Sequence, residues 1–145
     1  MSERATWTAD ARPLIDGSAR AVALVLDEPL SLWGGLDPHS GKIVDVRHPQ
    51  HGARVAGRAL VMSSGRGSSS SSSVLAEAIR AGVGPSLICL VEPDEIIVLG
   101  ALVSQLLDEV TVPVLVLEQA DHARLASGDT VSVVLGGRLE VVPAR

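Results

Sequence analysis

A run of hydroxyl-bearing residues is the part of this chain with the clearest potential for chemistry. It opens with Ser63-Ser64-Gly65-Arg66-Gly67-Ser68 and continues as unbroken serine to Ser73. An apolar, strand-like segment (59–62) precedes it, and a helix-like segment (74–80) follows it. Glycine lets the backbone turn sharply, and the first N–H groups of a helix have no partner within the helix. The spacing therefore predicts a loop between a strand and a helix, suited to an anion or an activated hydroxyl.

This loop could act in two ways. In a passive version, backbone N–H groups and Arg66 bind a carboxylate or a phosphate. In an active version, one serine is a general base whose alkoxide is stabilised by Arg66 and the helix N-terminus. A flexible Gly/Ser linker is the structural alternative, but no second domain of adequate size flanks the run, and a linker does not require Arg66. The sequence has neither the Gly-x-Ser-x-Gly elbow of α/β-hydrolases nor the Gly-Lys-Ser/Thr of a P-loop.

The four histidines have structural explanations beside functional ones. His48 and His51 flank Pro49, so they either order a loop or line a cleft. A metal site is disfavoured because no cysteine or glutamate lies at ligand spacing from them. His39 is predicted to lie in a surface turn, and His122, in a polar stretch, is predicted to be solvated.

Three other features have a similar double interpretation. Cys89 lies in an apolar strand and is predicted to be a small core residue. Trp33 precedes two glycines and is predicted either to plug the packing or to form a cleft wall. The acidic residues of segment 92–95 follow a strand end, where functional residues often lie, but the start of a helix explains them equally well.

The elements that must position these residues follow from apolar runs and turn signals. Strands are predicted at 20–27, 42–46, 58–62, 86–91, 112–117, 130–135 and 138–142. Helices are predicted from Ser72 or Ser73 to Gly82, and from Pro93 onward with an interruption at Gly100. A short turn or helix is expected within 118–127. Residues 1–18 are predicted to be a loosely held arm, and 19–145 a single domain. The fold class is α/β, a mixed barrel-like sheet with two or three helices.

Composition excludes several classes of function. The chain has 145 residues, no Phe or Tyr, and a net charge of −5, which disfavours nucleic-acid and anionic-membrane partners. No apolar run approaches the roughly 20 residues that span a bilayer, and the first residues do not resemble a secretory signal. A lone cysteine, Cys89, excludes an internal disulfide and cannot by itself hold a metal cluster. These features predict a cytoplasmic protein with no metal site of its own.

A series of short motifs along about two-thirds of the chain, from Ala21 to Leu117, resembles the small swivelling domain of the aconitase X family of dehydratases. Each motif alone is weak, but their order is specific. They are Glu28-Pro29-Leu30-Ser31-Leu32-Trp33-Gly34-Gly35, Asp37-Pro38 with Gly41, His48-Pro49-Gln50-His51-Gly52, Gly57-Arg58, Gly65-Arg66-Gly67-Ser68-Ser69, Asp94-Glu95-Ile96 and Gly100-Ala101.

The resemblance implies a swivelling β/β/α-type domain that closes over the substrate of a heteromeric or fused enzyme. A large aconitase X-type subunit would carry an iron–sulfur cluster on its own cysteines, so this chain alone would be inactive. The first serine after Gly-Arg-Gly, Ser68, would be the base that removes the proton beside the substrate carboxylate, while the cluster iron takes the leaving hydroxyl. Arg66, Gly67 and the amides of Ser69 and Ser70 would bind the substrate anion or stabilise the base.

The family implies two substrates, cis-3-hydroxy-L-proline in bacteria and phosphomevalonate in archaea. The segment Leu30–Gly35 and the Ala- and Arg-rich composition favour the bacterial type, whose product would be 1-pyrroline-2-carboxylate. A second hypothesis, of another class, is a non-catalytic anion-binding or scaffolding module that uses the same loop. A phosphohistidine-type carrier is a remote third, because serines occupy the place where its histidine would stand.

Overall fold

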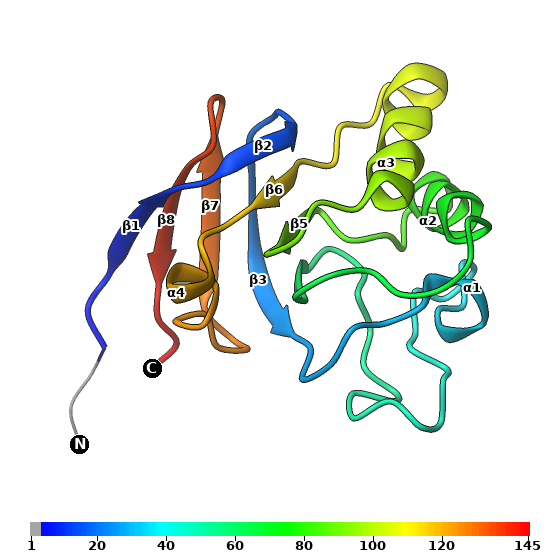
Figure 1. Ribbon diagram of the computed structural model, residues 1–145, viewed down its shortest axis with the longest axis horizontal. Coiled ribbons are helices and arrows are strands. Elements are labelled where there is room, and N and C mark those ends of the chain that lie inside the picture. The colour runs from blue at the N-terminus through cyan, green and yellow to red at the C-terminus, as the bar shows by residue number, and fades with distance from the viewer. Residues whose placement is uncertain (1–3) are drawn as a thin grey trace.

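Eight strands in one sheet form the frame of the protein, which we describe from a computed structural model covering residues 4–145 (Figure 1). The strand order is β1-β8-β7-β3-β4-β5-β6-β2. The strands are β1 (Trp7–Asp10), β2 (Arg12–Ile15), β3 (Ala19–Val25), β4 (Ala59–Val61), β5 (Leu87–Leu90), β6 (Val114–Val116), β7 (Thr130–Val134) and β8 (Arg138–Val142). The helices in the same residues are α1 (Leu32–Gly35), α2 (Ser71–Arg80), α3 (Glu95–Asp108) and α4 (Gln119–His122).

The sheet nearly closes into a barrel because its two outermost strands are adjacent in sequence. β1 and β2 stand at opposite ends of the strand order, yet only Ala11 separates them. The N–H of Ala11 donates to the carbonyl of Gly137 at 2.9 Å, which holds the crossing point against the β7–β8 hairpin. The predicted mixed, barrel-like α/β sheet is therefore confirmed. Helices were underestimated, with four instead of two or three, because α1 and α4 span only four residues each.

The N-terminal segment departs most from the sequence prediction. Of the predicted loose arm 1–18, residues 7–15 form β1 and β2, which pair with β8 and β6, and Trp7 and Ile15 are buried. This part of the prediction is wrong because the strands that pair with β1 and β2 come near the other end of the chain, where no local pattern reveals them. Pro13 fits because β2 is an outermost strand, where a missing N–H is tolerated. Residues 1–3 lie outside the described residues.

Of the parallel strands β3, β4, β5 and β6, the last three are buried on both faces, whereas β3 is partly exposed. Alternate residues point to opposite sides, so Leu60 and Ile88 join a core beneath the helices, whereas Val61 and Cys89 join a core inside the barrel. This two-sided burial explains the continuous apolar runs in the sequence. In Figure 1, α2 and α3 lie side by side at one end of the molecule, away from β1, β7 and β8.

Two local predictions are wrong. Segment 42–46 makes only single bridges, Ile43 with Leu36 and Lys42 with Arg54, so the excursion between α1 and β4 is loop and not strand. Helix α3 is not interrupted at Gly100 and runs unbroken from Glu95 to Asp108. A Cβ on Gly100 would lie 2.8 Å from the Ser72 carbonyl oxygen, so this glycine serves the close approach of α3 to α2.

Candidate functional site

The serine loop and two other loops meet at one edge of the sheet. β3, β4 and β5 are parallel neighbours, so the segments that follow them (26–32, 62–70 and 91–94) emerge at the same end. This edge is where parallel sheets commonly bind ligands. A pocket of about 130 Å³ lies there, lined by Leu30, Leu32, Gly65, Arg66, Gly67, Ser68, Ser71, Asp94, Ile96 and Ile97.

The two glycines of the loop are required by close contacts. Gly65 forms a bridge with Leu30, and a Cβ at Gly65 would collide with the carboxylate of Asp94. Gly67 has a φ of +91°, and a Cβ there would lie 2.5 Å from Ser31 Oγ. The two glycines thus let the loop pass close to segments 26–32 and 91–94 before it turns into α2.

Ser68, the predicted base, lines the pocket and is partly exposed. Its Oγ accepts a hydrogen bond from the N–H of Ser70 at 3.1 Å. Most other N–H groups at the start of α2 are occupied: those of Ser71, Ser72 and Ser73 donate to the carbonyls three residues earlier, at 3.0–3.2 Å. The expectation that the whole first turn is free to bind an anion is therefore wrong, because these tight turns satisfy its donors.

Arg66 lines the same pocket from the preceding position of the loop. Its Nη1 lies 4.0 Å from the Oε1 of Glu28, and both side chains are about half exposed. Solvent screens such a pair, so it contributes little to stability. The guanidinium consequently remains available to a second, better-placed anion.

Of the other residues predicted to bind the substrate, one lines the pocket and two do not. Gly67 lines the pocket, whereas Ser69 and Ser70 are exposed and outside its lining. Ser71, to which the sequence analysis gave no role, is buried in the pocket wall, and its Oγ accepts from the Trp33 N–H at 3.0 Å. Nothing in a run of identical serines could have distinguished it.

Asp94 completes the pocket from the loop after β5. Its Oδ1 accepts from the N–H groups of Ile96 and Ile97 at 2.9 and 3.1 Å, which makes it the N-cap of α3. The start of a helix therefore explains Asp94, as one of the two interpretations expects, and the same side chain also lines the candidate site.

His48 orders a loop, which is one of the two roles predicted for it. The ring is buried, its Nε2 lies 3.0 Å from the Glu28 carbonyl oxygen, and its Nδ1 accepts from the Gln50 N–H at 3.0 Å. Because Nδ1 accepts, Nε2 carries the proton and donates to Glu28. His48 thus anchors the backbone of Glu28, which faces Arg66, whereas His51 is exposed.

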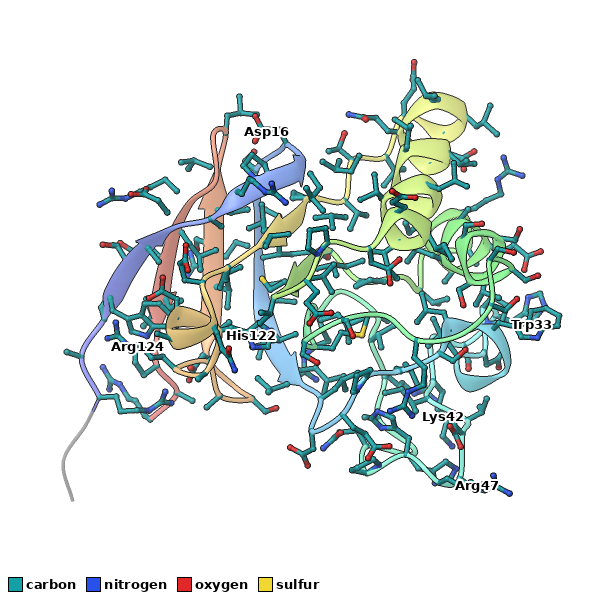
Figure 2. All side chains as sticks on the ribbon, viewed as in Figure 1. Asp16, Trp33, Lys42, Arg47, His122 and Arg124 are labelled. Carbon is teal, nitrogen blue, oxygen red and sulfur yellow. The ribbon has the colours of Figure 1, made fainter. Side chains whose placement is uncertain are left out.

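Two aromatic side chains differ from their predictions. Trp33 is 59% exposed and lies outside the pocket lining, so it neither plugs the core nor forms the cleft wall. Figure 2 shows its side chain at the outer surface, on α1. His122 is not solvated. Its Nε2 lies 3.0 Å from the Met62 carbonyl oxygen, and partial burial lowers its pKa, opposed by backbone hydrogen bonds (Figure 2). His39 is exposed in a turn, as predicted.

The described residues offer no place for a metal. Across 4–145, no three His, Cys, Asp or Glu side chains are grouped so that they could hold an ion. Cys89 is buried in the barrel core, and burial raises the pKa of its thiol to about 12, so it is a poor ligand. No helix in this part of the chain is long and apolar enough to cross a membrane.

Comparison with known proteins identifies the family. The family model described as the aconitase X swivel domain matches residues 8–141. The chain belongs to the aconitase X swivel-domain family. The match begins within β1 and ends within β8, so it extends beyond the stretch whose motifs carry the resemblance.

Relatives of this swivel domain include chains of very different length. It is 44% identical over 124 residues to a cis-3-hydroxy-L-proline dehydratase of Pseudomonas aeruginosa, covering 81% of this chain but 21% of that protein. The chain thus spans about one-fifth of that relative. It is 34% identical over 128 residues to the phosphomevalonate dehydratase small subunit of Methanopyrus kandleri, covering 88% of this chain and 90% of that one. The structure of Thermococcus kodakaraensis aconitase X matches with a TM-score of 0.83 at 28% identity, over 94% of this chain and 98% of that one.

Proposed function

We propose that this chain is the small subunit of an aconitase X-type hydro-lyase and that Ser68 is its general base. The observation that carries this proposal is the position of Ser68 in a family swivel domain. It lines a pocket at the carboxyl edge of the parallel strands, next to Arg66 and at the start of α2. The substrate we propose is cis-3-hydroxy-L-proline.

The surroundings of Ser68 supply part of the positive potential that a serine base needs. An unperturbed serine hydroxyl is a very weak base. The Ser70 N–H donates to Ser68 Oγ, and the ten-residue α2 directs the positive end of its dipole toward the loop. Arg66 adds a full charge in the same pocket. Arg66, Gly67 and the amides of Ser69 and Ser70 are then the groups that hold the substrate carboxylate or stabilise the alkoxide.

The proposed reaction removes water from adjacent carbons. The Ser68 alkoxide takes the proton from the carbon that bears the carboxylate, and the electrons of that C–H bond form a double bond to C3. The C3–O bond breaks and its electron pair leaves with the oxygen as hydroxide. Ser68 then gives up the proton it took, directly or through solvent, so hydroxide and proton leave as one water and the alkoxide is restored. The resulting enamine tautomerises to 1-pyrroline-2-carboxylate. Proton removal at an aligned base accelerates such steps by about 10²–10⁴-fold.

The iron–sulfur cluster that the family implies does not fit the residues of this chain. Its only cysteine, Cys89, lies in the barrel core, away from the pocket, with a thiol whose pKa is about 12. We therefore assign the cluster to a large subunit. The name "small subunit" carried by the Methanopyrus relative supports such a partner. We place the assembly in the cytoplasm, in keeping with an unpaired, buried thiol.

We choose between the two substrates by the sequence identity of this chain to relatives named for each of them. Identity is 44% to the Pseudomonas cis-3-hydroxy-L-proline dehydratase and 34% to the Methanopyrus phosphomevalonate dehydratase small subunit. Phosphomevalonate remains the alternative. A non-catalytic anion-binding module has less support, because loop carbonyls already use three N–H groups at the start of α2.

The test is a comparison of variants in the assembled enzyme. The tagged chain is purified with the large subunit that binds it, iron and sulfide are measured, and turnover is assayed on cis-3-hydroxy-L-proline and on phosphomevalonate. We expect Ser68→Ala to assemble normally and to lower kcat by about 10²-fold or more. Ser63→Ala, at an exposed position of the same loop and outside the pocket lining, is the matched control and should retain activity. Near-normal turnover of Ser68→Ala would remove Ser68 from the role of base.

A further inference from the structure

Helix α3 has its large apolar side chains on the wrong side for an outer helix of a monomer. The side facing the protein carries Gly100, Ala101 and Ser104, together with Ile97. The exposed large residues are leucines, among them Leu106 at 70% and Leu107 at 68% exposure. An outer helix normally places polar residues toward solvent. This pattern is typical of a helix that packs against protein on two faces. In this chain only one face of α3 is covered, and the other is exposed.

A groove of about 270 Å³ runs along this helix, between α3 and α2. Its α3 wall is apolar and consists of Leu99, Val103 and Leu107. Contiguous apolar surface of this kind marks a contact with another macromolecule.

The opposite wall and the end of the groove define its direction. On α2 the wall consists of the small side chains of Ser72, Ser73 and Ala76, which leave room for an incoming one, together with the exposed Glu77. The ion pair between Arg80 and Asp108, with Nη2 and Oδ1 3.0 Å apart, lies at the C-terminal end of both helices. The groove therefore begins at Ser72, one residue beyond Ser71 of the pocket. It ends at Arg80 and Asp108, whose charges are paired with each other.

From this we infer that the outer face of α3, with the α2–α3 groove, is the surface that binds an apolar segment of the large subunit. The inference rests on the proposed function, and deepens it by naming where the partner binds. The family supplies the reason for this occupant, because the chain spans one-fifth of the Pseudomonas relative. Whatever closes over the pocket at Ser68 and Ser71 is adjacent to Ser72 and Ser73, so one partner can cover both surfaces.

The test uses the purified complex of the full chain with its large subunit. In one variant, Leu106→Gln and Leu107→Gln are combined, since glutamine keeps helix propensity while removing apolar surface. The matched control combines Val134→Gln and Leu135→Gln on the β7–β8 hairpin, where 55% and 72% of these residues are exposed. We expect the dissociation constant of the complex to rise at least about tenfold for the α3 variant and less than about twofold for the hairpin variant. Unchanged thermal unfolding of both free variants shows that folding is intact.

The possible outcomes separate this inference from the proposed function. If the wild-type chain binds no large subunit, the proposed function fails and the inference fails with it. If the wild-type complex forms and the α3 variant binds within twofold of it, only the inference is overturned. If the free chain dimerises and the α3 variant is monomeric, a second copy is the occupant, and the large-subunit assignment is likewise overturned. Loss of affinity confined to the α3 variant, with hydrogen-exchange protection of α3 in the wild-type complex, supports it.

Discussion

The six consecutive serines Ser68 to Ser73 carry the same hydroxyl, and only their surroundings separate them. Ser68 lines the pocket and accepts from an N–H of the following turn. Ser71 is buried and satisfies the N–H of Trp33. Ser72 donates back to the carbonyl of Ser69 at 2.9 Å. One side chain is thus placed for chemistry, one joins α1 to α2, and one stabilises the turn, with position in the turn deciding which.

The conformation of the loop that presents Ser68 can be tested at Gly67. Gly67→Ala places a Cβ at φ +91° and 2.5 Å from Ser31 Oγ, so strain and a clash combine. We expect the free energy of unfolding to fall by about 1–3 kcal/mol in urea titration and turnover of the assembled enzyme to fall with it.

Gly52 provides the matched control for that change. It has the same φ of +91°, but an added Cβ would meet nothing within 4 Å. Gly52→Ala should cost about 1 kcal/mol from strain alone and leave turnover unchanged. Equal losses of turnover in the two variants would mean that the contact with Ser31 does not position the loop.

At the scale of elements, strands that produce a local sequence pattern were predicted, and strands that depend on distant pairing partners were missed. Strands β4 to β6 were predicted because burial on both faces produces continuous apolar runs. β1 and β2 were missed because their alternation is short and their partners lie far along the chain. Asp94 could have been placed in the site, since loops that follow neighbouring parallel strands emerge at one edge. Ser71 could not, because its neighbours in the run are identical.

For Gly100 of α3, helix propensity and the structure predict opposite effects of substitution by alanine on stability. Helix propensity alone predicts that Gly100→Ala stabilises the protein by about 1 kcal/mol. The structure predicts the reverse, because the new Cβ would lie 2.8 Å from the Ser72 carbonyl oxygen and 3.0 Å from Leu75 Cβ. Relieving these contacts means moving α2 backbone, so we expect a net loss of about 1–3 kcal/mol in urea unfolding. Stabilisation by Gly100→Ala would show that the two helices separate without cost.

At the scale of the whole molecule, one buried carboxylate joins the two ends of the described chain. The Asp129 side chain is buried and accepts two hydrogen bonds from the Arg4 guanidinium, at 2.6 and 3.1 Å. It also accepts from the N–H groups of Ala126 and Ala144, at 3.0 and 3.1 Å. Arg4 precedes β1, Ala144 follows β8 and Asp129 precedes β7, so Asp129 joins the start of β1 and the end of β8 to the start of β7. No local sequence pattern indicates this role, because Arg4 and Ala144 lie far from each other along the chain.

Asp129 makes stability depend on pH in acid. Burial opposes ionisation of the carboxyl, but the hydrogen bonds from Arg4, Ala126 and Ala144 outweigh it and lower its pKa. The folded state therefore binds fewer protons than the unfolded state, whose Asp pKa is about 3.9. The stabilisation is present above that value and is lost as pH falls through the lower, folded-state pKa.

The prediction concerns the difference in unfolding free energy between the wild type and Asp129→Asn, measured from pH 7 to pH 3. At pH 7, Asp129→Asn should lower the free energy of unfolding by about 2 kcal/mol, because an amide cannot accept all four hydrogen bonds. Other carboxylates titrate equally in both proteins, so the gap in unfolding free energy should narrow as pH falls below about 4. Asp10→Asn, at an exposed strand position, is the matched control and should track the wild type. A gap that is constant from pH 7 to pH 3 would mean that ionised Asp129 does not hold the two ends together.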